Sequence, residues 1–399
     1  MRSSLRILFV GTKPAFPPFD GGRLLMWNTI VQLAARGHRI TFVAPDLSLD
    51  HRESKDHLSQ HCEAVHLVSA RTGFFTPSLI GAAMTGKPVS IIRHSHRAVR
   101  KLITEEIIRK TYDVIHAEQV HSLVNLPRSG DLPPVVLRAQ NVESQLWRMV
   151  AGIKPRVAWL ARREARRMSA HEADALSRSA TTIALTANDG DILGGAMGMA
   201  VRRIRVIPPP FPSLLPKAEE PLEGDPAIVL VAGSWLPNWD STRWFLASIW
   251  DEIRRLSPAA KLHVFGSRAP RNATAVRWQN MAEESISLFR PGGILVVPLR
   301  IASGIRMKIL EAWARGVPVV ATPEAVCGLD GTDGKEFLLA RNGPEFAAAI
   351  QRLRQRPEIR KELVAGGRSA LATRFEPNLV ASMLEEAYLE AAARSIPVN

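Results

Sequence analysis

The chain has 399 residues, more than one compact hydrophobic core usually holds, so two domains are expected. Its hydrophobic content of 46% and charged content of 23% are those of a soluble globular protein. No window approaches the roughly 18 consecutive apolar residues that a membrane span requires. The two cysteines, Cys62 and Cys327, lie far apart and belong to no metal-binding motif, which favours a reducing cytoplasm.

The net charge of +14 is concentrated in the first half of the chain. Up to Pro212 there are 29 Lys and Arg residues against 17 Asp and Glu residues, an excess of 12, and beyond Pro212 the excess is 2. Residues 93–110 and 154–167 are the most basic stretches, with Trp147 and Trp159 beside or inside the second. Basic residues interleaved with Trp favour an anionic membrane surface, and a solvated helix face is the alternative. No recognisable nucleic-acid-binding module accompanies the charge, so no nucleic-acid partner is expected.

The first half follows the element order of a parallel α/β sheet. Residues 5–10 read as a strand, 11–22 as a loop, 23–36 as a helix and 39–44 as a second strand, which is a βαβ unit. Helical patterns separate most of the later strands, and one long helix is expected over residues 156–179. The later strands are expected at residues 64–68, 114–116, 135–137, 182–185 and 205–207.

A proline-rich segment at residues 208–226 then indicates a linker. It begins with Pro208-Pro209-Pro210 and contains four further prolines, at 212, 216, 221 and 226, and proline interrupts a helix or a central strand. A second α/β series follows it, with the last helix expected at residues 378–393. Its other elements are strands at 228–232, 262–265, 294–297 and 317–321 and helices at 241–256, from about 305, and near 344–354. We therefore expect a first domain at 1–207, a linker at 208–226, a second domain at 227–375 and a C-terminal helix within 376–399.

The most informative segment follows the strand expected at 294–297. Ser303, Gly304, Arg306 and Lys308 fall in a loop and the first turn of a helix, where unpaired N–H groups and a partial positive charge suit a phosphate. Glu311 lies one turn beyond Lys308 on nearly the same face, and its carboxylate could accept hydrogen bonds from sugar hydroxyls. This pattern suggests a nucleotide-sugar site, and an ordinary helix with solvated cations is the alternative.

Residues 294–329 resemble the donor-site region of the family 4 (group 1) glycosyltransferases. In that family a Gly-Thr-Arg-x-Lys-x-x-Glu-Ala helix start leads into Gly-x-Pro-Val-Val-x-Thr. The resemblance implies the GT-B fold, an α/β class with two Rossmann-like domains facing across a cleft and a C-terminal helix that packs back on the first. It also implies a retaining glycosyltransferase that moves a sugar from a nucleotide-diphosphate donor to a glycan, lipid-linked or other acceptor. No metal and no cofactor are expected, and a catalytically silent scaffold that binds glycan or a partner is the alternative.

Two further segments of the first half resemble the same family. Gly21 and Gly22 match its Gly-Gly loop, which approaches the donor phosphates and the acceptor, although a plain turn is the alternative. Residues 112–119 resemble its Asp-Val-x-His-x-His pattern, with Glu118 in place of the second His. Glu118 could accept a proton from the acceptor hydroxyl or could be a loop carboxylate, and His121 is the nearest alternative for that role. We expect the catalytic group to comprise Glu118, Arg306, Lys308 and Glu311.

Substrate contacts are expected at two more places. Asn141 and Glu143 resemble part of the His-Asn-Val-Glu segment of some relatives, with Gln140 in place of the His, and Asn141 is alternatively a helix cap. Gly233 and Ser234 resemble a phosphate- or ribose-contacting loop, after which Asp240 is expected to cap the next helix.

The family's Glu-x7-Glu pattern is incomplete in this chain. Its second Glu falls on Glu311, whereas Ser303 occupies the position of the first, which leaves the donor sugar open. The partners expected are therefore a nucleotide-sugar donor, a glycan or lipid-linked acceptor, and an anionic membrane surface that the N-terminal domain would contact. We expect a cytoplasmic protein, peripheral at the inner face of the membrane if its basic stretches bind there.

Overall fold

The computed structural model describes residues 4–48, 51–70, 78, 81–82, 84–128, 130–195, 204–233, 236–266, 276–279 and 285–393. The chain divides into two compact units. Unit 1 comprises Met1–Pro210 together with Pro377–Asn399, and unit 2 comprises Phe211–Glu376. The expected linker is thus divided, with residues 208–210 in unit 1 and the rest in unit 2.

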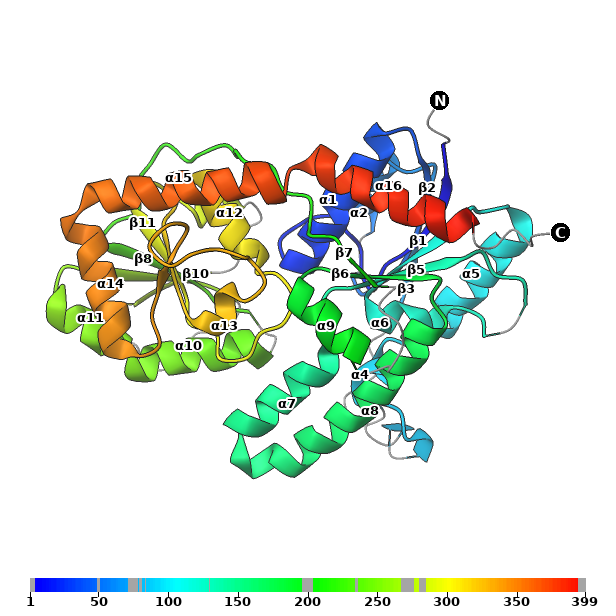
Figure 1. The fold of residues 1–399 in the computed structure, drawn as a ribbon, viewed down its shortest axis with the longest axis horizontal. Coiled ribbons are helices and arrows are strands. Elements are labelled where there is room, and N and C mark those ends of the chain that lie inside the picture. The colour runs from blue at the N-terminus through cyan, green and yellow to red at the C-terminus, as the bar shows by residue number, and fades with distance from the viewer. Residues whose placement is uncertain are drawn as a thin grey trace. The chain divides into compact units, whose positions relative to one another are not determined.

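Unit 1 is built on a seven-stranded parallel sheet in the order β3-β2-β1-β4-β5-β6-β7 (Figure 1). The chain adds strands on one side of β1 and then returns to add β4 on the other, so the order reverses between β1 and β4. Ligands of open parallel sheets bind outside the carboxyl ends of strands at such a point. The strands are β1 (Arg6–Val10), β2 (Arg39–Asp46), β3 (Ala64–Ser69), β4 (Val114–Glu118), β5 (Val135–Ala139), β6 (Thr181–Ala184) and β7 (Ile204–Val206).

Helices cover both faces of this sheet, which explains why its central strands are nearly continuous apolar runs. In β1, Ile7 and Phe9 belong to one core cluster and Leu8 and Val10 to another, as the alternation of side chains along a strand requires. The helices are α1 (Gly21–Ala35), α2 (Arg52–Ser59), α4 (Val89–Arg93), α5 (Arg97–Arg109), α6 (Gln119–Ser122), α7 (Glu143–Ile153), α8 (Ala158–Ser177), α9 (Ala187–Gly195) and α16 (Pro377–Ala393), and two 3-10 turns lie at Leu123–Asn125 and Pro155–Val157.

The C-terminal helix α16 lies against α1 within unit 1 (Figure 1). Tyr388 is fully buried in the same core cluster as Phe9, and its hydroxyl is 2.7 Å from Nδ1 of His116. Glu385 is also buried, and it accepts a hydrogen bond of 2.6 Å from Nη2 of Arg36. Apolar packing and polar contacts therefore both hold the end of the chain on the first sheet.

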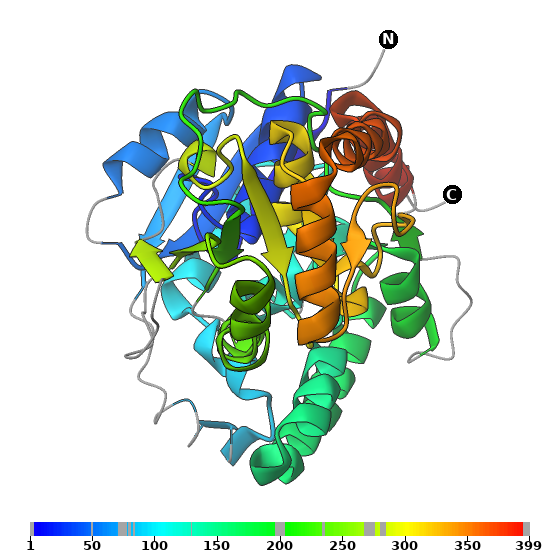
Figure 2. The same ribbon diagram turned by 90° about the vertical axis from the view of Figure 1, so that its left-hand side faces the viewer.

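Unit 2 has a six-stranded parallel sheet in the order β10-β9-β8-β11-β12-β13, whose strand order reverses between β8 and β11 (Figure 2). Its strands are β8 (Ala227–Val231), β9 (Lys261–Phe265), β10 (Val276–Gln279), β11 (Gly293–Val297), β12 (Val319–Ala321) and β13 (Leu338–Leu339). Its helices are α10 (Leu236–Ser248), α11 (Trp250–Leu256), α12 (Met307–Arg315), α13 (Pro323–Val326), α14 (Gly343–Gln355) and α15 (Pro357–Arg374), with a 3-10 turn at Ser285–Ser287.

Two helical segments of unit 2 differ from the expectation. The single helix expected at 241–256 is two helices, α10 and α11, separated at Ile249. Ile249 and Trp250 are both buried, and two adjacent side chains reach one core more easily where the helix is broken. The 18-residue helix α15 was not expected at all, since Gly366 and Gly367 lie inside it and glycine weakens a helix.

Both glycines of α15 permit close packing. A Cβ at Gly367 would be 2.4 Å from the ring of Trp313 in α12, and one at Gly366 would be 2.0 Å from the carbonyl oxygen of Lys335. Either contact is too short for any side chain, so the helix can lie on its neighbours only with glycine at these positions. The tertiary contact thus outweighs the local propensity.

Candidate functional site

The start of α12 lies at the strand-order reversal of unit 2. The loop after β11 contains Gly304, whose φ of +71° is in the left-handed region that glycine adopts without strain. Arg306 is the N-cap residue, so α12 begins at Met307 rather than near Ile305. Ser303 and Arg306 are both buried. The loop therefore places three of the predicted residues, Ser303, Gly304 and Arg306, and the N-terminus of a helix at the carboxyl end of β11, an arrangement that suits an anion.

Lys308 connects this helix to the neighbouring strand β8. Its Nζ donates hydrogen bonds to the carbonyl oxygen of Val231 at 3.1 Å and to Oδ1 of Asn238 at 3.3 Å. Across the described part of the chain Lys308 forms no ion pair with a carboxylate. Burial, with the charge of Arg306 as a smaller cause, lowers the pKa of Lys308 to about 8. A positive charge with only neutral partners is ready to bind an anion.

Gly233 lies beside the same group. A Cβ at Gly233 would be 2.6 Å from Nδ2 of Asn238, so glycine leaves the space in which Asn238 takes its present position and binds Lys308. Asn238 was not singled out from the sequence, although it stands in the loop that resembles the family. Gly233, Asn238 and Lys308 therefore form one cluster, and Ser234 lies outside the described residues.

Glu311 is one turn further along α12. Its side chain is largely buried, and Oε1 accepts a hydrogen bond from Nε of Arg315 at 3.2 Å. Arg315 also donates to the carbonyl oxygen of Pro216, which holds the guanidinium in place. Glu311 is thus a charged carboxylate oriented by an arginine four residues away.

Asp240 does not cap the next helix, contrary to the expectation. Helix α10 begins at Leu236, with Pro237 in its first turn, so Asp240 lies inside the helix. Its buried carboxylate accepts hydrogen bonds of 3.1 and 2.8 Å from Arg300 of the loop after β11. The Arg300 guanidinium also lies 5.3 Å from the ring centroid of Trp244. Asp240 therefore ties α10 to the loop that carries Ser303 and Gly304.

In unit 1, Gly21 and Gly22 are the first residues of α1 instead of part of the preceding loop. Asp20 is the N-cap residue, and its Oδ1 accepts hydrogen bonds of 3.0 Å from the backbone N–H groups of Gly22 and Arg23. Nζ of Lys13 lies 2.7 Å from the same carboxylate. A Cβ at Gly22 would be 3.2 Å from Oε1 of Gln140, so glycine brings the helix close to the end of β5.

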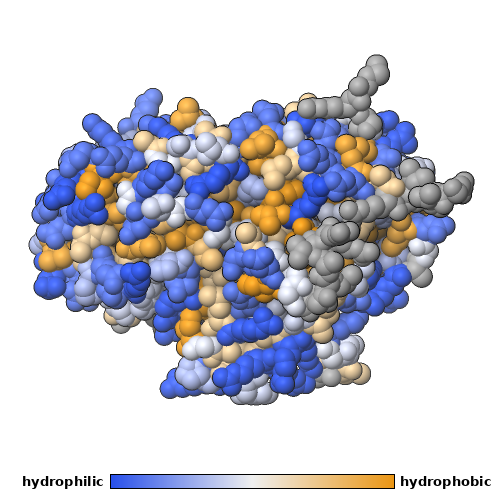
Figure 3. Space-filling model, in the orientation of Figure 1, coloured by the Kyte–Doolittle hydropathy of each residue, from blue (hydrophilic) through white to orange (hydrophobic). Residues whose placement is uncertain are grey.

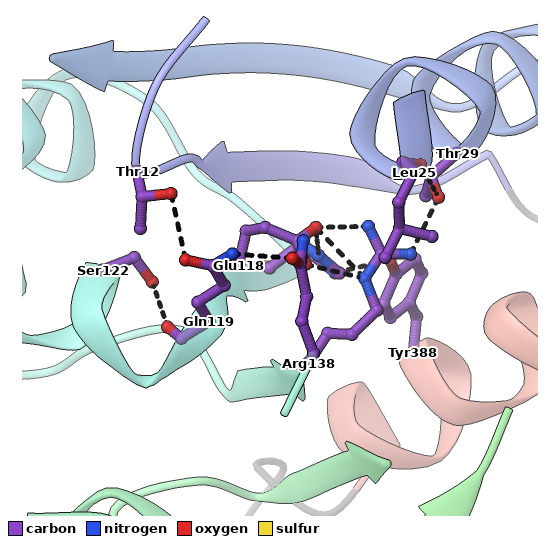
Figure 4. Close-up of polar contacts among 10 residues, drawn as sticks. Thr12, Leu25, Thr29, Glu118, Gln119, Ser122, Arg138 and Tyr388 are labelled. Atoms are coloured by element: carbon purple, nitrogen blue, oxygen red, sulfur yellow. Dashed lines mark hydrogen bonds and ion pairs between the residues drawn. The ribbon is translucent and has the colours of Figure 1, made fainter. Parts of the chain in front are cut away.

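A chain of side-chain hydrogen bonds joins three neighbouring strand ends in unit 1 (Figure 4). The hydroxyl of Thr12, after β1, donates to Oε1 of Gln119 at 3.3 Å. Nε2 of Gln119, after β4, donates to Oε1 of Gln140 at 2.6 Å, and Nε2 of Gln140, after β5, donates to Glu118 at 3.0 Å. The φ of Gln119 is +65°, a conformation that costs a side-chain-bearing residue energy and often occurs at functional sites. Sequence reasoning did not assign a function to Thr12, Gln119 or Gln140, and their only signal is that they directly follow strands.

Glu118 is fully buried at the end of this chain of hydrogen bonds (Figure 4). Arg138 donates from Nε to Oε1 at 2.9 Å, and Nε2 of His116 lies 3.2 Å from Oε2. Burial alone would raise the pKa of Glu118, but the Arg138 charge and the hydrogen bonds outweigh it and lower the pKa to about 2. Such a carboxylate is a weak base with no exposed oxygen, so the geometry argues against a proton-accepting role and for a structural one.

His121, the alternative to Glu118, is also buried. Burial lowers its pKa to about 4, with a further contribution from the charge of His171. The His121 ring also lies 4.6 Å from that of His94. It therefore packs among other histidines of unit 1.

Asn141 and Glu143 lie together at the start of α7. Nδ2 of Asn141 donates to Oε1 of Glu143 at 3.3 Å, and the N-cap residue is Val142, so Asn141 is not the helix cap. Burial raises the pKa of Glu143 to about 7. Glu143 is thus a carboxyl group that exchanges a proton near neutral pH, two residues after Asn141 and three after Gln140.

Within the ranges that the structure describes, no group of three or more His, Cys, Asp and Glu side chains could hold a metal ion. In the same ranges, no helix is both long enough and apolar enough to cross a bilayer.

Comparison with known proteins places these features in a wider context. Residues 226–356 match the family model described as glycosyl transferases group 1. The comparison with curated proteins found no significant match. Among solved structures, sucrose-phosphate synthase from Thermosynechococcus elongatus is similar with a TM-score of 0.71 and 15% identity, covering 98% of this chain and 100% of that one.

Two other solved structures show the same similarity of fold. Anabaena HepE in complex with UDP and glucose has a TM-score of 0.65 and 14% identity, covering 96% of this chain and 98% of its own. The catalytic domain of starch synthase IV from Arabidopsis thaliana, bound to ADP and acarbose, has a TM-score of 0.64 and 13% identity, covering 98% of this chain and 100% of its own.

Proposed function

We propose that the chain is a retaining glycosyltransferase of group 1, a proposal supported by the match of residues 226–356 to the group's family model and by the similarity of the fold to solved glycosyltransferases. It uses a nucleotide-sugar donor. The acceptor that we propose is a glycan, a lipid-linked sugar or a related molecule. The observation that carries the proposal is the cluster at the strand-order reversal of unit 2, where Lys308, Gly233 and the N-terminus of α12 converge.

In this proposal unit 2 binds the donor. Arg306, Lys308 and the first N–H groups of α12 bind the diphosphate and stabilise the charge that develops as it leaves. Ser303, Gly304, Gly233 and Ser234 contact phosphate or ribose, and Glu311 accepts hydrogen bonds from the sugar hydroxyls. HepE was solved with UDP and glucose and also with UDP-glucose, which makes the UDP-sugars the first donors to test.

Unit 1 binds the acceptor and the reacting end of the donor. Gly21 and Gly22 let backbone N–H groups come close to the substrate. Asn141 and Glu143 contact the acceptor, and the pKa of Glu143 near 7 suits proton exchange with its hydroxyl. Glu118 holds Gln140 and the ends of β4 and β5 in position. We place the protein in the cytoplasm, because neither Cys62 nor Cys327 forms a disulfide.

Calorimetric titration with UDP and with GDP tests the donor site. Arg306→Ala should weaken nucleoside-diphosphate binding by about 1.5–3 kcal/mol, the contribution of hydrogen bonds to charged groups. Arg352→Ala, which removes an exposed arginine of α14, is the matched control and should bind as the unchanged protein does. Equal affinity of Arg306→Ala and the control for both nucleotides would refute the assignment.

A thermal-shift screen of UDP-, GDP- and ADP-sugars identifies the donor. A donor at about 100 times its dissociation constant should add about 2.7 kcal/mol of stability. Released nucleoside diphosphate, even from slow hydrolysis without an acceptor, then measures turnover directly. A donor that binds tightly but is never cleaved would favour a catalytically silent binding protein.

A further inference from the structure

The helical hairpin of α7 and α8 extends away from the seven-stranded sheet of unit 1 in both views (Figures 1 and 2). Its two helices pack against each other, and the 3-10 turn Pro155–Val157 joins them. We call residues 153–163 the hairpin tip. A tip that extends from the sheet can reach a flat surface that the rest of unit 1 does not touch.

The hairpin tip exposes large apolar side chains. Trp159 is 67% exposed, Val157 45% and Leu160 38%. Among the described residues, no other exposed large hydrophobic side chains lie within four residues of one another in sequence. Leaving this apolar area in water is unfavourable, so a cluster of this kind marks a contact surface.

Cations surround the apolar cluster. Residues 144–171 contain seven Lys and Arg residues and a single acidic residue, Glu164, which is buried and paired with Arg167. Arg156, Arg162, Arg163 and Arg166 are exposed, and none forms an ion pair with a described residue. Hydrophilic side chains accordingly gather over α7 and α8 on the face shown in Figure 3.

The exposed residues of α8 share one side of the helix. Trp159, Arg162, Arg163 and Arg166 recur at spacings of three and four residues, which places them on adjacent turns of one face. The opposite side of the helix, with Ala161, Ala165 and Met168, is buried. Helix α8 is therefore anchored along one side and presents Trp and Arg along the other.

We propose that the hairpin tip docks unit 1 on an anionic lipid bilayer, with Trp159 and its apolar neighbours at the level of the headgroups and the arginines on lipid phosphates. Trp is suited to this depth because one end of its ring is polar. Long arginine side chains place their apolar stems in the interface and keep their charge among the headgroups. The proposal deepens the proposed function by naming where a lipid-linked acceptor meets unit 1, but docking requires neither donor nor acceptor.

A bilayer fits the hairpin tip better than a nucleic acid does. Phosphate contacts to a nucleic acid would use the arginines and would leave Val157 and Leu160 in water. A bilayer takes up both groups, because the cations meet its negative surface and the apolar side chains enter its interface.

Vesicle flotation of the full chain tests the proposal. The protein should float with vesicles of phosphatidylcholine and phosphatidylglycerol, but not with phosphatidylcholine alone, and should dissociate at about 1 M salt, where the Debye length is about 3 Å. Arg162→Gln, Arg163→Gln and Arg166→Gln together should lower the affinity about 100-fold, since each basic residue at the surface contributes about fivefold. Trp159→Ser should lower it about tenfold.

Matched controls lie in unit 2. Arg352→Gln in α14, Arg356→Gln between α14 and α15, and Lys361→Gln in α15 together remove the same charge from exposed positions, and Leu214→Ser removes another exposed apolar side chain. Both variants should float as the unchanged protein does. A third variant, Trp159→Phe, should still float but should lose quenching of Trp fluorescence by lipids brominated in their acyl chains.

Three results would overturn the proposal: equal flotation with neutral and anionic vesicles, no effect of the triple Arg→Gln change, or single-stranded RNA bound as tightly as anionic vesicles with the same sensitivity to the variants. Titration of each preparation with UDP keeps this test separate from the proposed transferase. Normal UDP binding without flotation would reject the docking surface alone.

Discussion

Each sheet has an ionisable side chain at the point where its strand order reverses, but the two side chains have opposite kinds of partner: charged in unit 1 and neutral in unit 2. At the strand-order reversal of unit 1, the carboxylate of Glu118 is fully buried and is bound by Arg138, His116 and Gln140. At that of unit 2, the partners of the Lys308 ammonium group among the described residues are a carbonyl oxygen, of Val231, and an amide oxygen, of Asn238. One charge is neutralised inside its own unit, and the other has only neutral partners.

The difference separates a charge that holds a site together from one that binds a ligand. Glu118 has its pKa lowered by Arg138 and by hydrogen bonds in spite of its burial, so the charged form is stabilised where it lies. Lys308 has its pKa lowered by burial and by the charge of Arg306, so its charged form is destabilised until an anion arrives. An ionisable residue at the end of a strand therefore has to be judged by its partners as well as its position.

The largest effect is expected for Arg138→Met, which leaves Glu118 buried without its cation. We expect unit 1 to lose about 3–5 kcal/mol of unfolding free energy, as measured by urea denaturation. Lys101→Met at an exposed surface pair is the control, with an expected loss under about 1 kcal/mol. Because the pKa of Glu118 falls from 4.5 to about 2 on folding, its stabilising contribution is present above about pH 4.5 and is lost as the pH falls toward 2.

The companion variant Glu118→Gln decides between the two roles of this residue. If Glu118 is structural, the variant should be less stable, while its folded fraction retains most of its activity. A stable Glu118→Gln protein without transferase activity would show that Glu118 takes part in the reaction, and the contrast between the two units would then fail.

Glu311→Gln is expected to lower kcat/KM by about 10- to 150-fold, equivalent to the 1.5–3 kcal/mol of a hydrogen bond to a charged group. The change keeps the shape of the side chain, so the melting temperature should stay nearly constant. Glu358→Gln, at an exposed position of α15, is the control. Loss of folding with normal specific activity in the remaining soluble protein would instead make Glu311 a structural residue like Glu118.

Nucleotide binding is expected to depend on pH through Lys308. The pKa of Lys308 in the free protein is about 8, and a bound diphosphate raises it by favouring the charged form. UDP affinity should therefore be constant below about pH 8 and fall up to tenfold for each further pH unit. Calorimetry across this range measures the profile, and Lys308→Arg, which stays charged, should flatten it. A fall of the same size in Lys308→Arg would assign the titration to another group.

The smallest effect is expected for Gly233→Ala. The new methyl group would lie 2.6 Å from Nδ2 of Asn238, so the amide has to move away from Lys308. UDP affinity should fall about three- to fivefold, under about 1 kcal/mol, with little change in stability because the displaced group is the end of a side chain. Gly152→Ala in α7, where an added methyl group meets nothing within 4 Å, should leave UDP affinity unchanged.

The residues alone were sufficient for the features that arise from local periodicity and local motifs. The largely apolar runs at residues 5–10 and 294–297 predict buried parallel strands, and the structure has β1 at Arg6–Val10 and β11 at Gly293–Val297. The phosphate-type helix start at Gly304 and Arg306 is visible because all its elements lie within a few residues. The excess of positive charge in the first half of the chain is likewise evident from the sequence, because it requires only a count of charged residues.

Only the tertiary structure decided the features that depend on neighbours distant in sequence. Helix α15 contains Gly366 and Gly367 because Lys335 and Trp313 lie against it, and no local signal reveals that contact. The motif around Glu118 predicts a reactive carboxylate, whereas in the structure this carboxylate is buried and bound by Arg138 and His116. The environment of Lys308 is set by Val231 and Asn238, which lie about 70 residues earlier in the sequence and give its ammonium group neutral hydrogen-bond partners. The sequence specifies which groups are present, but their pKa values and exposure are set by the atoms that folding places around them.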